Sequence, residues 1–305
     1  MQATLPTPGP SPYAGETITK TPDWAGATAG DIWFNNLSIG TFLVAALGAL
    51  AAPAAFAGIA RYAVPLALVF LITDLVLLVA GLGDPARFHH MLRVFKPSSP
   101  MSFGTWALSL YGVLLGVASV VAVLSWPLLG GVQGWLARAG VWGAIEFLGK
   151  AAAVLAILPA AGGVLYKGPL FSITSQPGWK DARWLGGYLV NSAILLGCSV
   201  VLLIALIVGQ GAAVHLLNRA MLGLLVLDLA FLALLYRNVA PVYRVRYGVN
   251  QRTFIPIAVL VGGIILPFLL LLAGTLLIAV PPLLILLSTL VSRYVFMRLP
   301  HGDAT

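Results

Sequence analysis

Charged residues stand inside long apolar runs of this chain, where a charge needs a partner, a cavity or a proton path. Asp74 lies within LALVFLITDLVLLVAGLG, and Asp228 lies within MLGLLVLDLAFLALLYR. Glu146 precedes Lys150 by four residues in VWGAIEFLGKAAAVL, which is the favourable order for an ion pair along a helix. Inserting a charge at the centre of a membrane costs about 2.5–3.5 kcal/mol. These four residues are therefore candidates for a proton path, although an ion pair or a buried hydrogen bond would also explain them.

A second group of polar residues lies at the ends of the apolar runs. Two adjacent histidines stand in GDPARFHHMLRVFKPSSPMSFGTW, residues 83–106, which joins the second run to the third. Two asparagines open the first run, and a tyrosine ends the fourth. Each also has an ordinary explanation, because loop histidines are often solvated and tyrosine is common at membrane surfaces. The residues of this group are His89, His90, Asn35, Asn36 and Tyr166.

Gathered at one end of a helix bundle, these side chains would suit a quinone. The ring carbonyls of a quinone need hydrogen-bond donors, its reduction needs two protons, and its tail needs lipid. Asp74 lies about two helical turns before the histidine loop, so it is a further candidate for proton transfer. Together with Asp74, the group predicts that quinone or quinol binds at one membrane face.

The composition shows which elements must position these residues. Of the 305 residues, 60% are hydrophobic and only 9% are charged, whereas a soluble domain has about 25% charged residues. Apolar runs of about 20 residues recur, long enough to cross a membrane as helices, and strand-like alternation is absent. The sequence predicts an all-α integral membrane protein, a bundle of about eight transmembrane helices. The expected spans are residues 33–56, 61–82, 104–126, 141–165, 184–208, 214–236, 254–274 and 276–297.

Eight spans place both termini on one side of the membrane. The loops on that side are long, and they cover residues 83–103, 166–183 and 237–253. The positive-inside rule makes this basic side cytoplasmic, but a surface that docks an acidic partner would carry the same bias. The side that carries a partner is therefore left open. Of the 17 Lys and Arg residues, those that do not fall on this side are Arg61, Arg138, Arg219 and Lys150.

The cysteine and histidine content limits the cofactors that this chain could hold by itself. Cys198 is the only cysteine, so the chain cannot supply the four thiolates that an iron–sulfur cluster usually takes. No histidine stands in the middle of a span, so no haem is expected, and no nucleotide-binding or nucleic-acid-binding motif is visible. The expected organisation is a polar tail over residues 1–30, a transmembrane domain over residues 31–299 and a short tail over residues 300–305.

Three stretches of the chain resemble motifs of a known family of membrane subunits. LGDPARFHHMLRVFKPSSPMSFGTW, residues 82–106, resembles the signature of the NrfD/PsrC family of polysulfide-reductase-type complexes. YKGPLFSITSQPGW, residues 166–179, resembles the second loop motif of that family, and NNLSIGTFLVAAL, residues 35–47, resembles its opening helix. The likeness covers residues 31–200 well and extends to the rest only through topology.

The chain departs from the family pattern at three places. Lys167 replaces the usual threonine, which changes the rim of the expected site. Gly81 stands where many members have an aspartate, so Asp74 is the only acid in its helix. Asn35 and Asn36 replace a pair of glycines.

The resemblance implies a bacterial inner-membrane, multi-pass subunit that is not a complete enzyme alone. It would bind menaquinone or ubiquinone, as quinone or quinol, and exchange electrons with a ferredoxin-like iron–sulfur subunit, often joined to a molybdopterin catalytic subunit. Tyr166 matches the tyrosine that contacts quinone in the family. Partner docking is expected at Arg87, Arg93, Lys96 and Lys167.

Two other functions are compatible with the residues. A proton- or ion-translocating subunit without quinone chemistry would use the intramembrane charges Asp74, Glu146, Lys150 and Asp228 as a relay. No inverted repeat is visible, which disfavours transporters of the inverted-repeat type. A structural membrane anchor would bind no quinone at all.

Overall fold

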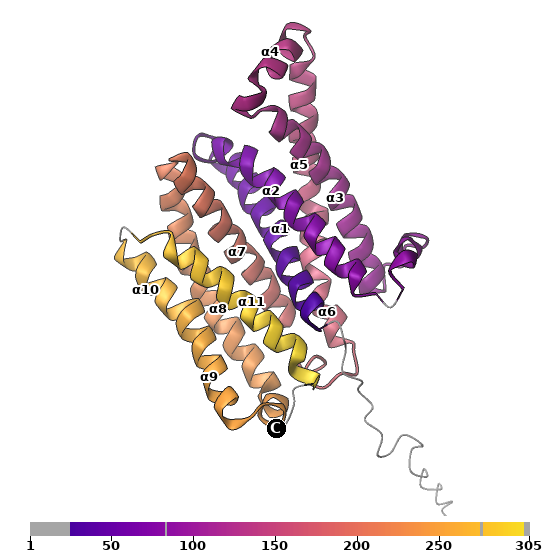
Figure 1. Ribbon diagram of the computed structural model, residues 1–305, viewed down its shortest axis with the longest axis vertical. Helices are drawn as coiled ribbons and strands as arrows, with labels where there is room; N and C mark the ends of the chain where they lie inside the picture. Colours follow the sequence, from indigo (N-terminus) through magenta and orange to yellow (C-terminus); the bar gives the residue numbers. More distant parts are fainter. Residues whose placement is uncertain (1–24, 83, 275–276, 302–305) are drawn as a thin grey trace, which may run out of the picture.

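The computed structural model describes residues 25–82, 84–274 and 277–301, and within these it is a bundle of helices without strands (Figure 1). Eight helical segments are long and apolar enough to cross a membrane, which confirms the predicted fold class. The helices are α1 (Ala25–Ala51), α2 (Pro53–Ala80), η1 (Pro85–Leu92), α3 (Pro100–Leu124), η2 (Pro127–Leu129), α4 (Gly130–Arg138), α5 (Trp142–Leu165), α6 (Lys167–Ser172), α7 (Leu185–Val208), α8 (Gly211–Arg246), α9 (Val249–Leu260), η3 (Val261–Ile265), α10 (Leu266–Ala273), α11 (Val280–Arg298) and η4 (Leu299–His301).

The observed ends of the first span and of the last two spans can be compared with the predicted ones. Helix α1 begins at Ala25, before the predicted start of the span at residue 33, and it includes Asp31, which is buried. Residues 25–30, which were expected to belong to the polar tail, are part of α1. The rest of that tail, residues 1–24, and residues 302–305 of the C-terminal tail lie outside the described residues. Between the last two spans, α10 ends at Ala273, and Gly274 has a φ of 59°. The seventh span therefore ends next to residue 274, the predicted end of that span, at a glycine that adopts the left-handed conformation.

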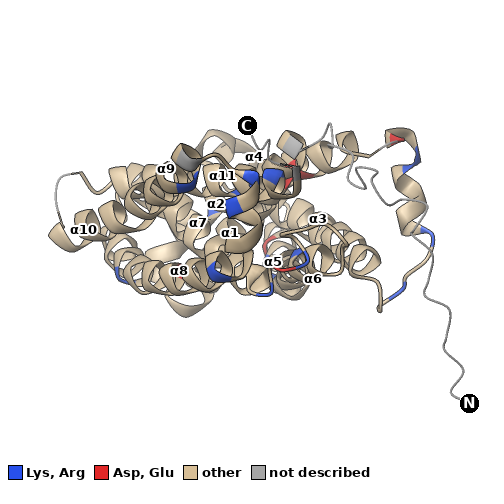
Figure 2. Cartoon of the chain, turned by 90° about the horizontal axis from the view of Figure 1, so that it is seen from below, with Lys and Arg blue, Asp and Glu red and all other residues tan. Residues whose placement is uncertain are grey.

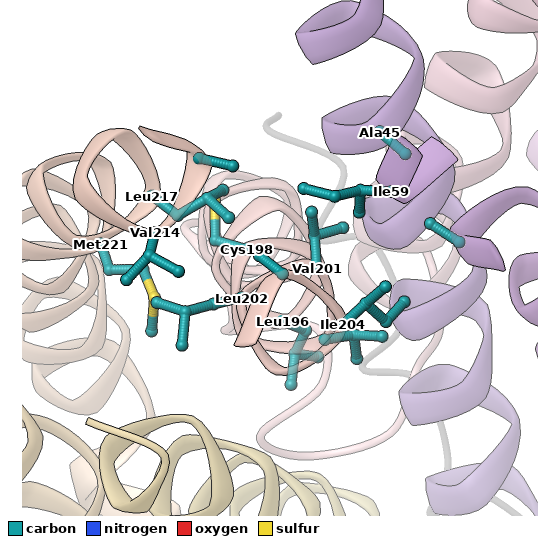
Figure 3. Packing of buried hydrophobic residues seen from close by; sticks show 14 of the residues in the cluster. Ala45, Ile59, Leu196, Cys198, Val201, Leu202, Ile204, Val214, Leu217 and Met221 are labelled. Atoms are coloured by element: carbon teal, nitrogen blue, oxygen red, sulfur yellow. The ribbon is translucent and has the colours of Figure 1, made fainter. Parts of the chain in front are cut away.

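Helices α1 and α7 pack against each other at the centre of the bundle. A Cβ atom added to Gly40 would lie 1.8 Å from the carbonyl oxygen of Ala193, and one added to Gly197 would lie 2.2 Å from the carbonyl carbon of Gly40. The two backbones therefore touch, as small residues allow in membrane helices. Figure 3 shows the other sides of α7, where Val201 and Cys198 pack among residues of α1, α2 and α8.

The two ends of the bundle differ. Helix α1 begins at the same end where α11 finishes, together with η1, α6 and residues 173–184; we call this the loop-rich end (Figure 1). Lys and Arg residues are spread across the bundle in the view onto this end (Figure 2). At the opposite end, the loop over residues 127–140 contains η2 and α4. The membrane side on which the loop-rich end lies stays a prediction.

Candidate functional site

Three buried charges meet near the loop-rich end. The ammonium Nζ of Lys167 lies 3.0 Å from Oδ2 of Asp31 and 3.6 Å from Oδ1 of Asp74. The side chain of Lys167 is only 2% exposed, and that of Asp74 is fully buried. We call Asp31, Asp74 and Lys167 the ionic cluster. Such a group is stable in a low-dielectric interior only because its opposite charges are in contact.

The fold brings these three residues together from distant parts of the chain. Asp31 follows the start of α1, and Asp74 precedes the end of α2, so the antiparallel pair places both at the loop-rich end. Lys167 opens the short helix α6. Gly168 next to it packs on the backbone of Gly186, where a Cβ atom would lie 2.5 Å from Cα. This close approach holds α6 against α7 and keeps Lys167 inside the bundle.

The two neighbouring asparagines of α1 have different partners. Asn35 donates from Nδ2 to Oδ2 of Asp74 over 3.0 Å, so it belongs to the surroundings of the ionic cluster. Asn36 donates from Nδ2 to the carbonyl oxygen of Leu189 over 3.3 Å, and it ties α1 to α7. Both side chains are fully buried. Only Asn35 is therefore in contact with a titratable group.

Several oxygen atoms around the cluster have unused hydrogen-bonding capacity. Among the described residues, Oδ1 of Asp31, Oδ1 of Asn35 and Oδ1 of Asp74 accept no hydrogen bond, although Oδ1 of Asp74 faces Lys167. A buried acceptor without a donor costs about 1–3 kcal/mol. The cluster can therefore accept hydrogen bonds from an additional donor.

Tyr166 lies beside the cluster and immediately precedes Lys167. Its side chain is buried, and the ammonium of Lys167 lies 5.9 Å from the centre of its ring. The ring rests on Gly104 of α3, where a Cβ atom would lie 2.3 Å from a ring carbon. Among the described residues, no hydrogen-bond partner reaches its hydroxyl group. The phenol is therefore held in place by packing, and its O–H remains available.

We predict that Gly104→Ala displaces this ring. The added methyl group has no space beside Tyr166, so overpacking should lower the free energy of unfolding by about 1–3 kcal/mol. The matched control is Gly116→Ala in the same helix, where an added Cβ meets nothing within 4 Å. Thermal unfolding of both variants in detergent measures the difference, and equal unfolding temperatures would contradict the tight contact.

The histidines do not join this buried site. His89 and His90 are exposed on η1, a segment without buried residues beside α3. Their rings lie 4.4 Å apart, and Nδ1 of His89 lies 3.2 Å from the carbonyl oxygen of Ala86. The expected gathering of both histidines with Asn35 and Tyr166 is therefore not found in the isolated chain.

Three of the four basic residues that were expected to dock a partner are exposed, and the fourth is buried. Arg93 and Lys96 are exposed, and Arg87 is exposed while its Nε lies 3.0 Å from Oδ2 of Asp84. Lys167, in contrast, is buried within the ionic cluster, so its charge is used inside the chain and does not reach the surface. A docking role for Lys167 does not fit this position.

The remaining intramembrane charges fall into two separate places. Lys150 and Glu146 form an exposed pair along α5, with 2.7 Å between Nζ and Oε1. Asp228 is buried on α8, where its Oδ1 accepts a hydrogen bond of 3.0 Å from Nδ2 of Asn191 on α7. The three residues therefore do not form one continuous path. No group of three or more His, Cys, Asp or Glu residues in the described part of the chain could hold a metal ion.

Sequence reasoning missed a further buried cation. The sequence assigns Arg293 to the basic side of the membrane, and the structure buries its side chain, which is 2% exposed within α11. It donates from Nη2 to Oγ of Ser192 over 2.8 Å, and its guanidinium carbon lies 4.6 Å from the ring centre of Tyr188. An arginine near the end of an apolar span usually reaches the surface, so the local sequence gave no sign of its burial.

Comparison with known families identifies the architecture. Residues 23–297 match the family described as polysulphide reductase, NrfD. The chain belongs to the NrfD family. NrfD proteins are membrane subunits of quinone-interacting oxidoreductase complexes. The match extends well past residue 200, so the C-terminal spans of this NrfD chain belong to the family as much as the loop motifs do. The chain has no match among the curated proteins.

Proposed function

We propose that this NrfD chain binds quinone or quinol beside Tyr166 and the ionic cluster and exchanges electrons with an iron–sulfur partner subunit. The observation that carries the proposal is the free hydroxyl group of Tyr166 next to a buried group of two acids and one base. The proposed setting is the bacterial cytoplasmic membrane, with menaquinone or ubiquinone as the ligand. A molybdopterin catalytic subunit would bind beyond the iron–sulfur subunit.

The side chains present fit a quinone. A quinone carbonyl accepts hydrogen bonds, and the O–H of Tyr166 is a donor, with the ammonium of Lys167 5.9 Å from the centre of the same ring. The hydroxyl groups of a quinol are donors, and Oδ1 of Asp31 and Oδ1 of Asn35 are buried acceptors without partners. When bound, the quinone supplies two-electron, two-proton redox chemistry.

The ionic cluster supports the proton part of this proposal. Two carboxylates facing one ammonium carry an excess negative charge, which is costly away from water. The cluster can therefore take up one proton without breaking its contact with Lys167. Asp74 is the expected carrier, because Asn35 fixes its Oδ2 while its Oδ1 makes only the longer contact with Lys167. His89 and His90 remain candidates for proton exchange with the surface.

A groove near Tyr166 is a suitable place for the isoprenoid tail. It measures about 620 Å³ and runs between α3 and α5. Gly162 lies in its wall, one helical turn before Tyr166, and Phe103 lies next to Gly104, on which the tyrosine ring rests. Apolar residues dominate the groove, which faces outward from the bundle, where lipid would be. The tail is therefore expected to leave toward the membrane between α3 and α5.

Partner docking is proposed at the loop that contains η1. The basic side chains of Arg87, Arg93 and Lys96 are exposed there, and so are the aromatic rings of Phe88 and Phe95. Exposed rings among positive charges are typical of a surface that a partner covers. A ferredoxin-like subunit on this loop would sit near the proposed quinone site, at whichever membrane side the loop-rich end faces.

Tyr166→Phe tests the proposal. Removing the hydroxyl group deletes one donor to the quinone without changing the packing against Gly104, so quinone affinity should fall about 10-fold. The measurement is a titration of the purified complex with a short-tail quinone, followed by calorimetry. The control is Tyr294→Phe, an exposed tyrosine whose hydroxyl accepts from Arg298. Equal affinities of the Tyr166→Phe variant and the wild type would place the quinone elsewhere.

A further inference from the structure

The two halves of the chain repeat the same hydrogen bond. In the first half, Asn35 on α1 donates to Asp74 on α2 over 3.0 Å. In the second half, Asn191 on α7 donates to Asp228 on α8, also over 3.0 Å. Each pair joins the first and second spans of its half, and the two residues of a pair are 39 and 37 positions apart. Corresponding spans of the two pairs are offset by four, an even number, so both pairs cross the membrane in the same direction.

A cation and a tyrosine accompany each pair. Lys167 follows the fourth span and lies 5.9 Å from the ring centre of Tyr166. Arg293 lies near the end of the eighth span, and its guanidinium carbon is 4.6 Å from the ring centre of Tyr188. Both cations are 2% exposed. The second half therefore contains the same kinds of polar group as the proposed quinone site, toward the same end of the bundle.

The cation of the second half is less completely satisfied than that of the first. Among the described residues, no carboxylate lies within 4.0 Å of Arg293, whereas Lys167 contacts two. Its Nη2 donates to Ser192 over 2.8 Å, its Nη1 lies 3.4 Å from Oγ of Ser292, and its Nε has no partner. A buried guanidinium with an unused N–H favours an acceptor oxygen nearby.

An apolar cleft opens beside this group. It measures about 330 Å³ between α8, α9 and α11, within the range of small-molecule sites. Tyr188 and Ser292 line it, and their hydroxyl oxygens lie 3.0 Å apart. The rest of the wall is mainly aliphatic and aromatic. The lining residues include Leu232, Ala233, Val239, Pro256, Val259 and Phe296.

We propose that this cleft is a second quinone site, with the quinone ring at Tyr188 and Ser292 and the tail between α8 and α9. The proposal rests on the function proposed for the first half, because the repeated residues are the argument for the same ligand. A quinone fits better than a phospholipid, because the lining of the cleft carries neutral hydroxyl groups and no charged side chain that would hold a phosphate. Ser292 donates its hydroxyl proton to the carbonyl oxygen of Thr289 over 2.8 Å, so Tyr188 is the donor to Ser292. The O–H of Tyr188 would turn from Ser292 to donate to one quinone carbonyl.

Photolabelling with an azido-quinone in the whole complex tests this assignment. Peptides from α5 and α6 report the first site, and peptides from α7 and α11 report the second. The wild type should be labelled in both halves. Ala233→Trp fills the cleft at an exposed position, so it should reduce labelling of α7 and α11 at least tenfold and leave the first half labelled. The control is Ala230→Trp, an exposed alanine of α8 outside the cleft wall, which should leave both sites labelled.

The outcomes separate the two proposals. Labelling confined to the first half, or labelling of α7 and α11 that persists in Ala233→Trp, would overturn the second site and leave the first intact. Labelling confined to the second half, and lost in Ala233→Trp, would support the cleft and overturn the site at Tyr166. Failure to label either half would overturn both.

Discussion

Lys167→Met is expected to destabilise the protein by about 3–5 kcal/mol, the largest effect of any single charge removal in the chain. The substitution keeps the length of the side chain but leaves Asp31 and Asp74 buried without their counter-charge. Little folded protein should remain in the membrane, and what remains should unfold at a lower temperature. Thermal unfolding in mild detergent and the yield of folded protein measure the effect.

Two variants make this result specific. Lys96→Met removes an exposed lysine at the same end of the bundle and should leave the unfolding temperature nearly unchanged. The triple variant Asp31→Asn, Asp74→Asn, Lys167→Met removes all three charges together, so it should recover most of the lost stability. It should still lack the proton-exchanging group of the proposed site. If Lys167→Met unfolded at the wild-type temperature, the ionic cluster would contribute no net stability.

Gly40→Ala is expected to separate the two central helices. The new methyl carbon would lie 1.8 Å from the carbonyl oxygen of Ala193, which is backbone and cannot rotate away. Helix α1 or α7 must therefore move along much of its length, and the cost should exceed about 4 kcal/mol, at the upper end for one substitution. Denaturant or thermal unfolding measures it.

The comparison for this variant is another glycine-to-alanine change. Gly223 lies inside α8 with nothing within 4 Å of an added Cβ, so Gly223→Ala should be neutral or stabilise the protein by up to about 1 kcal/mol. The two variants make the same chemical change and differ only in their surroundings. Similar unfolding temperatures for both would show that α1 and α7 do not touch at Gly40.

Hydrophobic runs were sufficient to predict the fold, because membrane spans depend on length and composition. The eight spans and the turn at Gly274 follow from these properties. The same reasoning misplaced Lys167 and Arg293. A cation near the end of a span normally extends to the surface, and only a distant partner reverses this. Asp31 is 136 positions from Lys167, so no local sequence pattern predicts their contact.

Part of the candidate site was also predicted from the sequence. Asn35, Asp74 and Tyr166 were identified because polar and aromatic groups inside or beside apolar runs require an explanation, and the structure places all three around the ionic cluster. His89 and His90 were grouped with them because they share a membrane face, but a shared face does not fix the path of a loop. The similar spacing of Asn35 to Asp74 and of Asn191 to Asp228 was the available signal for the second half.

The contact between α1 and α7 also bears on the order of events during biosynthesis. Asn36 and its acceptor, Leu189, are 153 positions apart, and Gly40 and Ala193 are separated equally far along the chain. Helix α1 is synthesised well before α7, so its contact with α7 can form only after the fifth described span has been inserted. Until then Gly40 lacks its close contact with Ala193. The N-terminal half thus completes its packing only after synthesis of the C-terminal half has begun, and a nascent chain halted before Leu185 would lack the contact between α1 and α7.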